Sequence, residues 1–272
     1  KGMVKRCADS GFDLAAGKVE VVPTAHYFMG GVIVDTDTRA GIEGLYVAGE
    51  DAGGAHGSNR LGGNGVANST VYGGIAGDVM AQDIRKFGQL RDPDDAMLEQ
   101  EIVDALLPFS QAAMPLQPLR QSLQNIMWEH SGVIRTKAGM EHGSEKLNAI
   151  TEEVMGAGVF EESRAFNLTW HDWLNLRSLC DISKVITRAG LARENSRGAH
   201  YREDFPDQGD LQSSYYTVAR RSEDGAIHMQ RRNVDFTVVS PGKTILPHDA
   251  PETLVESPPL QMTEARLLHS TG

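Results

Sequence analysis

The chain has 272 residues, of which 40% are hydrophobic and 23% charged, and its formal net charge is −11. This composition is typical of a globular protein of one or two domains, and the acidic balance argues against binding to a nucleic-acid backbone. No apolar run approaches the ~18 residues of a membrane span, and no signal peptide opens the sequence. Cys7 and Cys180 are isolated, so we predict no disulfide framework, no metal site and a reducing, cytoplasmic setting.

Two motifs separated by a turn-rich stretch lie in the first part of the chain. The segment His26–Gly31 (HYFMGG) follows a short apolar run and joins a histidine to a glycine pair. Aspartates, threonines and a glycine between residues 35 and 41 predict a hairpin or loop. Residues 44–48 then predict a buried strand, which leads through small residues to the carboxylate of Glu50.

The most informative stretch is residues 56–68 (HGSNRLGGNGVAN), where Arg60 precedes a glycine-rich turn. The turn feeds a helix of small residues that we expect to run to about Ala81. The first turn of a helix leaves backbone N–H groups unpaired at the positive end of the helix dipole, and glycines let a flat or anionic ligand approach them. The stretch predicts a place where a cofactor meets a carboxylate-bearing substrate, although a turn needed only for tight packing is the alternative.

The three motifs, in this order and spacing, resemble the succinate dehydrogenase/fumarate reductase flavoprotein family, which includes L-aspartate oxidase. The resemblance rests on the patterns HYxMGG, GLYxAGE and HGxNRLGxN. It covers essentially all of this chain but only about the C-terminal half of the family pattern. The G-x-G-x-x-G fingerprint of a dinucleotide-binding domain is absent from the chain. We therefore expect a fragment or one piece of a split polypeptide, without the N-terminal FAD-binding and capping segment.

The cofactor that the resemblance implies is FAD, and six residues are assigned to it. The resemblance implies that Glu50 accepts hydrogen bonds from ribityl hydroxyls, whereas a capping or surface glutamate is the alternative. The N–H groups at the start of the helix are expected to face the pyrimidine edge of the flavin, where negative charge gathers on reduction. The predicted cofactor-binding residues are Gly30, Gly31, Glu50, Asn64, Gly65 and Val66.

His26 and Arg60 are expected to bind the substrate, because each can donate charge-assisted hydrogen bonds to a dicarboxylate. His56 is predicted to support the site, and residues 27–29 are predicted to form core walls. The resemblance places the proton-transferring arginine in the absent capping region. We therefore assign no catalytic residue to this chain and expect the chain alone not to catalyse turnover.

Residues 93–192 are predicted to form a helical domain after a polar linker. Asp94 and Asp95 favour a helix start, and apolar residues recur at helical spacing after them. Further helices are expected over residues 115–130, 142–155 and 161–189, the last with more apolar surface than one face needs. An antiparallel bundle is the predicted arrangement, as in the family that the chain resembles.

The third part, residues 193–272, begins with a charge-dense segment. We interpret this segment as a clasp of ion pairs between the helical domain and the core, and substrate binding is the alternative. Short strands are expected over residues 213–220 and 228–239, followed by an extended, proline-rich tail. The predicted fold is thus the α/β portion of an FAD-binding domain (1–84), a helical bundle (93–192) and a small C-terminal β and extended segment.

The leading functional hypothesis is part of an FAD-dependent oxidoreductase of the succinate/fumarate type, transferring a hydride between flavin and a dicarboxylate. L-aspartate oxidase or a related flavoenzyme is the nearest alternative, because L-aspartate oxidase shares these motifs but takes an amino dicarboxylate. GGNG at residues 62–65 departs from the serine-bearing form common to both and leaves the choice open. A hypothesis of another class is a helical docking module for an iron–sulfur partner subunit. In that case the cytoplasmic chain would associate with a membrane through its partner subunits.

Overall fold

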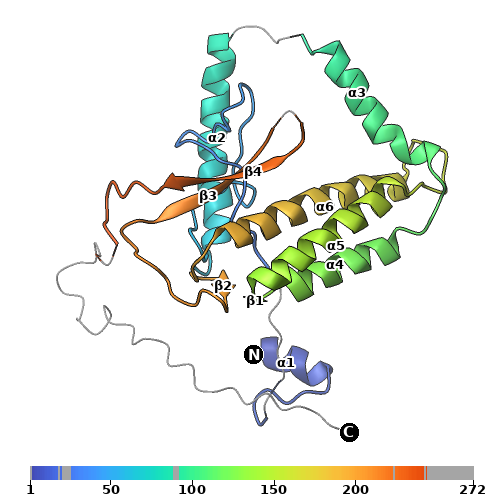
Figure 1. Ribbon diagram of the computed structural model, residues 1–272. Coiled ribbons are helices and arrows are strands. Elements are labelled where there is room, and N and C mark those ends of the chain that lie inside the picture. The colour runs from blue at the N-terminus through green and yellow to red at the C-terminus, as the bar shows by residue number, and fades with distance from the viewer. Residues whose placement is uncertain are drawn as a thin grey trace.

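The computed structural model describes residues 2–17, 19, 26–87, 92–222, 224–241 and 243. It is mixed, with long helices and few strands (Figure 1). The helices are α1 (Gly2–Asp9), α2 (Asn64–Phe87), α3 (Asp95–Leu106), α4 (Gln117–Ser131), α5 (Lys137–Met155) and α6 (Leu168–Ala192), with a 3-10 turn, η1 (Leu107–Ser110). The strands are β1 (Ile134–Arg135), β2 (Tyr201–Arg202), β3 (Tyr215–Arg221) and β4 (Ile227–Asn233).

The predicted helices are present, and side chains at their N-termini explain where three of them start. The Asp94 carboxylate accepts hydrogen bonds from Ala96 N and Met97 N at the start of α3, as the sequence indicated. Thr136 caps α5 and Asn167 caps α6 in the same way. Each cap satisfies a backbone N–H that the helix itself leaves unpaired.

The main hydrophobic core lies where α4, α5 and α6 pack against one another. Its members are Leu116, Leu119, Leu123, Ile126, Leu147, Ile150, Val154, Ala157, Val159, Trp173, Leu176 and Cys180. Trp173 is fully buried, and its indole Nε1 donates to the carbonyl oxygen of Val154 at 2.9 Å. This bond satisfies the indole N–H and connects α6 to the end of α5.

The long helix α6 is less completely covered than its apolar content suggested. Trp173, Leu176 and Cys180 are buried against α4 and α5, whereas Leu179 and Ile182 are exposed. Phe166, expected inside the helix, precedes it with φ 55° and a fully exposed ring. Helix α6 therefore starts at Leu168 rather than near Glu161, because Asn167 caps it there.

Strands β3 and β4 form the antiparallel hairpin that was predicted, with Tyr215 opposite Asn233 and Arg221 opposite Ile227. Strand β4 ends at Asn233, earlier than the predicted 239. Strands β1 and β2 form a short parallel pair. Of the predicted tail, residues 242 and 244–272 lie outside the described part of the chain, as do residues 21–25 before the first motif.

The strand predicted at residues 44–48 is not present as a strand. Tyr46 makes a single antiparallel bridge with Arg39, and Leu45 is exposed. An extended ladder needs a neighbour along its whole length, and among the described residues only this bridge is available to the segment. The turn expected at 35–41 is present: the Asp35 carboxylate accepts from Asp37 N and Arg39 N.

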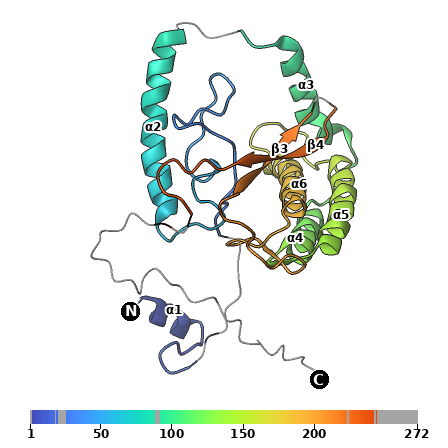
Figure 2. The ribbon, with the colours of Figure 1, turned by 60° about the vertical axis from the view of Figure 1, so that its left-hand side comes forward.

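Two views show how the parts surround the motifs. Helix α2 and the loops that carry the motifs lie on one side of the β3–β4 hairpin, and α4, α5 and α6 lie on the other (Figure 2). The segment after α6 reaches the motif loops, because Ala199 N donates to Ser58 O at 2.9 Å. Helix α1 lies apart from these elements in both views and buries none of its residues (Figure 1).

Candidate functional site

The first and second motifs run side by side. Val32 N donates to Asp51 O at 2.7 Å, and Gly53 N donates back to Val32 O at 2.9 Å. Gly31 makes this approach possible, because a Cβ on that residue would lie 2.2 Å from Asp51 O. The predicted cofactor residue Gly31 thus has a packing role of its own.

Glu50 connects the same two motifs through its side chain. Its Oε1 accepts a hydrogen bond from Phe28 N at 2.8 Å. Glu50 is exposed, and its Oε2 has no partner among the described residues. One carboxylate oxygen therefore fixes the loop, and the other is open to a hydroxyl of a ligand.

The third motif ends where α2 begins, as predicted. Asn64 N donates to Leu61 O at 3.2 Å, whereas the N–H groups of Gly65 and Val66 have no partner among the described residues. The Val66 side chain is 77% exposed. Two free donors therefore lie at the positive end of a 24-residue helix.

Arg60 lies against the first motif. Its Cζ is 4.5 Å from the centroid of the Tyr27 ring, and its backbone N–H points at the Met29 sulfur, 3.0 Å away. Of residues 27–29, predicted to form core walls, Tyr27 and Met29 are half-buried, whereas Phe28 is exposed, so the prediction was wrong for Phe28. Leu61, expected to pack beneath the helix, is instead 74% exposed.

His26 is exposed, and no described residue hydrogen-bonds to its ring. Its sequence neighbour Tyr27 contacts Arg60, so His26 and Arg60 lie on neighbouring segments of the structure. An exposed imidazole and a guanidinium on neighbouring segments are donors that a dicarboxylate can accept from.

His56 connects the motifs through contacts with Asn68 and Tyr27. Asn68 Nδ2 donates to His56 Nε2 at 3.0 Å and to Gly49 O at 3.3 Å, and the Tyr27 hydroxyl lies 3.3 Å from the same His56 nitrogen. Asn68 is buried. This arrangement agrees with the supporting role predicted for His56. Asn68 was not singled out from the sequence, although its place in the stretch 56–68 is a signal that could have found it.

A partly buried ion pair that the sequence did not indicate fastens α2 to the turn at residues 35–39. Arg39 Nε and Nη2 donate to the two carboxylate oxygens of Asp83 at 2.9 and 3.2 Å, and the Tyr46 hydroxyl donates at 2.7 Å. These hydrogen bonds, from Arg39 first and then Tyr46, hold the pKa of Asp83 below its ordinary value. The pair positions the helix that carries Gly65 and Val66.

The charge-dense segment after α6 forms a joint between elements. Arg202 is 1% exposed, and its Nη1 donates to Gly190 O and Arg193 O at the end of α6. Its Nε and Nη2 donate to the Asp204 carboxylate, each at 2.7 Å. Because these donors are engaged, the geometry favours the clasp interpretation over substrate binding.

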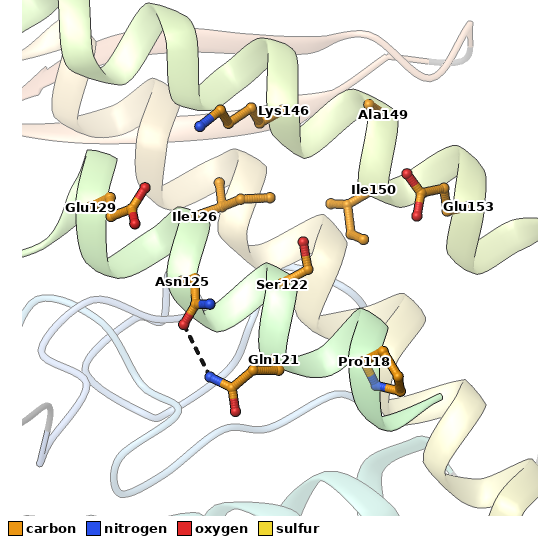
Figure 3. A pocket seen from close by; sticks show the side chains of 10 residues that line it. All are labelled: Pro118, Gln121, Ser122, Asn125, Ile126, Glu129, Lys146, Ala149, Ile150 and Glu153. Carbon is orange, nitrogen blue, oxygen red and sulfur yellow. Dashed lines mark hydrogen bonds between the residues drawn. The ribbon is translucent and has the colours of Figure 1, made fainter. Parts of the chain in front are cut away.

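A separate groove of about 590 Å³ lies between α4 and α5 (Figure 3). Ile126 and Ile150 form its apolar floor, and Glu129, Lys146 and Glu153 lie along its rim. None of the predicted site residues lines this groove. Among the described residues, no cluster of histidine, cysteine and carboxylate side chains could hold a metal ion.

Two protein-family models match separate parts of the chain. Residues 5–66 match the FAD binding domain, and residues 120–246 match the fumarate reductase flavoprotein C-terminal domain. The first match contains every residue that the sequence assigned to substrate or cofactor. The second match covers most of α4, and α5, α6 and the hairpin.

Named relatives give the same result. The chain is 32% identical over 210 residues to one of the subunits of the fumarate reductase (CoM/CoB) of Methanothermobacter marburgensis, covering 75% of this chain and 37% of that protein. It is 31% identical to the fumarate reductase flavoprotein subunit of Mycobacterium tuberculosis, covering 84% of this chain and 40% of that protein. L-aspartate oxidase of Yersinia pestis is 32% identical, covering 73% of this chain and 35% of that protein.

The fold is shared with solved structures. A variant of Escherichia coli quinol fumarate reductase FrdA superposes with a TM-score of 0.80 at 27% identity, over 89% of this chain and 43% of that one. Mycobacterium smegmatis Sdh1 superposes with a TM-score of 0.76 at 30% identity, over 86% of this chain and 40% of that one. The chain belongs to the succinate dehydrogenase/fumarate reductase flavoprotein family. The resemblance drawn from the three motifs is thus confirmed.

Within this flavoprotein family the chain represents a portion, because it spans less than half the length of the relatives it matches. It carries part of an FAD binding domain together with the family's C-terminal domain. None of its described helices is both long and apolar enough to cross a membrane.

Proposed function

We propose that this chain supplies one wall of the active site in an FAD-dependent oxidoreductase of the succinate/fumarate type. In this proposal the chain contacts the flavin through α2 and the second motif, and contacts a dicarboxylate through His26 and Arg60. FAD, when bound, supplies the hydride chemistry. The family matches and the named relatives support this activity.

The residues present fit one end of the cofactor. The unpaired N–H groups of Gly65 and Val66 can donate to the pyrimidine edge of the flavin, where the helix dipole favours negative charge. Glu50 can accept from a ribityl hydroxyl through its free Oε2, since its other oxygen is taken by Phe28 N. Gly31 lets the first motif pack against the backbone of Asp51, next to Glu50, because a Cβ on Gly31 would lie 2.2 Å from Asp51 O.

The observation that carries the proposal is the environment of Arg60. Its guanidinium lies on an aromatic ring beside the start of α2, and no described carboxylate forms an ion pair with it. A permanently charged guanidinium that has no described anionic partner is suited to a substrate carboxylate, and His26 can hold the second carboxylate. Together they would orient the substrate and fix its distance from the flavin.

Substitution of Arg60 tests this proposal in the flavin-loaded enzyme that contains the chain. Arg60→Ala should weaken dicarboxylate binding by about a hundredfold or more, as expected for loss of a charge-assisted contact, while flavin content stays unchanged. Binding is measured by titrating succinate or fumarate and following the flavin absorbance. Arg120→Ala, at a surface pair on α4, is the matched control and should bind normally. Unchanged Michaelis parameters in Arg60→Ala would refute the substrate role.

L-aspartate oxidase is the second candidate, favoured by the 32% identity with the Yersinia pestis enzyme. The two candidates differ in one substituent, because L-aspartate carries an amino group where succinate has hydrogen. Turnover of L-aspartate but not of succinate by the flavin-loaded enzyme would select this candidate, and the reverse would exclude it.

We further propose the division into residues 1–84, 93–192 and 193–272, with the first part completed by an FAD-binding and capping segment. The helices of the second part, as a bundle, would then offer a surface to an iron–sulfur subunit. The description of several relatives as subunits supports such a partner. Membrane association would follow from the partner, and a cysteine-rich chain that copurifies would identify it.

A further inference from the structure

Tyr27 lies between the predicted substrate arginine and the network behind it. One face of its ring carries the Arg60 guanidinium, with 4.5 Å from Cζ to the ring centroid. At the far end of the ring, the Tyr27 hydroxyl is 3.3 Å from His56 Nε2, and the two rings meet edge to face with centroids 5.3 Å apart. Tyr27 therefore contacts two other residues of the site through different parts of its side chain.

The Arg60 guanidinium is held without being neutralised. Its Nη1 donates to Leu61 O at 3.2 Å, and its Nε is buried without a hydrogen-bond partner in the described part of the chain. Among the described residues, no carboxylate lies within ion-pairing distance of it. An aromatic face attracts a guanidinium but leaves its net charge in place, whereas a carboxylate would cancel that charge.

The Tyr27 side chain is held at its hydroxyl end by His56 and Asn68. Asn68 Nδ2 donates to Gly49 O and to His56 Nε2, so this histidine nitrogen must be an acceptor and the imidazole carries its proton on Nδ1. The Tyr27 hydroxyl lies 3.3 Å from the same nitrogen. The chain of contacts from Gly49 to Tyr27 connects all three motifs.

The start of α2 leaves room for the stacked pair. A Cβ on Gly65 would lie 3.0 Å from Tyr27 Cε2 and 3.7 Å from Arg60 Nη1. Any side chain at residue 65 would therefore press on the tyrosine ring. The helix start that offers the free N–H groups is thus in contact with the aromatic ring that carries the arginine.

We propose that Tyr27 is a positioning residue, whose ring holds the uncompensated Arg60 guanidinium in place for a substrate carboxylate. His56 and Asn68 fix the ring through its hydroxyl. The inference rests on the proposed function, because it assumes that Arg60 binds the dicarboxylate. It adds that affinity depends on a second residue that need not touch the substrate.

A double-mutant cycle tests the inference in the flavin-loaded enzyme, with the dissociation constant of succinate or fumarate as the readout. Tyr27→Met keeps an apolar side chain but removes the aromatic face, and should weaken binding about tenfold. In an Arg60→Gln background the same change should alter binding by less than about twofold, since the charge that the ring holds is gone. Tyr27→Phe, which keeps the ring, should recover most of the affinity lost in Tyr27→Met. Tyr72→Met on α2 is the matched control and should bind as the parent does.

The outcomes distinguish the positioning role of Tyr27 from the proposed role of Arg60 in substrate binding. An equal loss of affinity in both backgrounds would show that Tyr27 acts only through the general structure and would overturn the inference. No loss in Tyr27→Met, while Arg60→Ala still abolishes binding, would overturn the inference and leave the proposed function standing. Normal binding in Arg60→Ala would overturn the proposed function itself. Where Tyr27→Met does not fold, Tyr27→Leu and Tyr27→Phe carry the same comparison.

Discussion

Three arginines of this chain differ in what surrounds the guanidinium, and the difference decides what each can do. Arg39 pairs with Asp83, and Arg202 pairs with Asp204, in both cases through two nitrogens. Arg60 stacks on a tyrosine ring and has no described carboxylate partner. The first two are therefore structural ion pairs, whereas Arg60 retains a charge that a ligand can use.

His200 is the residue at which stability should depend on pH. Its Nδ1 accepts from Arg135 Nη1 at 3.0 Å, and its Nε2 is buried without a described partner. Burial and the neighbouring Arg135 charge lower the pKa of His200 to about 4, so the folded protein holds the neutral ring. Stability from this group is present above the ordinary pKa of about 6.5 and is lost as the pH falls towards 4.

We expect His200 alone to lower the free energy of unfolding by about 2 kcal/mol between pH 7 and pH 5. His200→Asn keeps an acceptor near Arg135 but cannot titrate, so it should remove that part of the pH dependence. Urea unfolding at several pH values measures the effect for both proteins. An equally steep loss of stability in His200→Asn would contradict the assignment.

At the scale of elements, Arg202 and Asp204 join the end of α6 to the beginning of α5. Arg202 donates to Gly190 O in the last turn of α6 and to Arg193 O just after it, and Asp204 accepts from Lys137 N in the first turn of α5 at 2.8 Å. Both contacts also match the helix dipoles, which favour a cation at one end and an anion at the other. Hydrogen bonds from Arg202 lower the pKa of Asp204 to about 2.

Asp204→Asn should therefore destabilise the protein by about 2 kcal/mol, because it leaves the buried Arg202 charge unpaired. Asp172→Asn makes the same change at the exposed pair with Arg120 and should cost no more than about 0.5 kcal/mol. Because the pKa of Asp204 is lowered, its contribution is present above pH ~4 and is lost towards pH 2. Thermal unfolding of both variants at neutral pH checks the difference, and equal effects would contradict it.

At the scale of the molecule, the chain corresponds to only part of the flavoproteins that it matches. It spans less than half the length of its relatives, and its match to the FAD binding domain covers only residues 5–66. Helix α2 also exposes large apolar side chains along one face, among them Val66, Met80 and Ile84. Such a face is typical of a surface that another segment or chain covers.

We accordingly expect the 272-residue chain by itself to show no dicarboxylate turnover. In the proposed function its donors hold one end of the flavin, but no residue of the chain is assigned to proton transfer. The measurement is a visible absorption spectrum and a succinate–fumarate assay on the purified chain and on the longer flavoprotein. Turnover by the chain alone would contradict this expectation.

The sequence by itself determined the family, the order of the motifs and most helix positions, because these depend on local patterns. Asp94 and Asn64 mark helix starts through contacts within a few residues, and they lie where predicted. The prediction of a strand at residues 44–48 was wrong, because a strand depends on neighbouring strands that local propensity does not specify. Only the tertiary structure placed Tyr27 beneath Arg60, and paired Arg39 with Asp83 and Arg135 with His200, which lie 44 and 65 residues apart. Such contacts depend on the path of the whole chain, and a local pattern carries no record of that path.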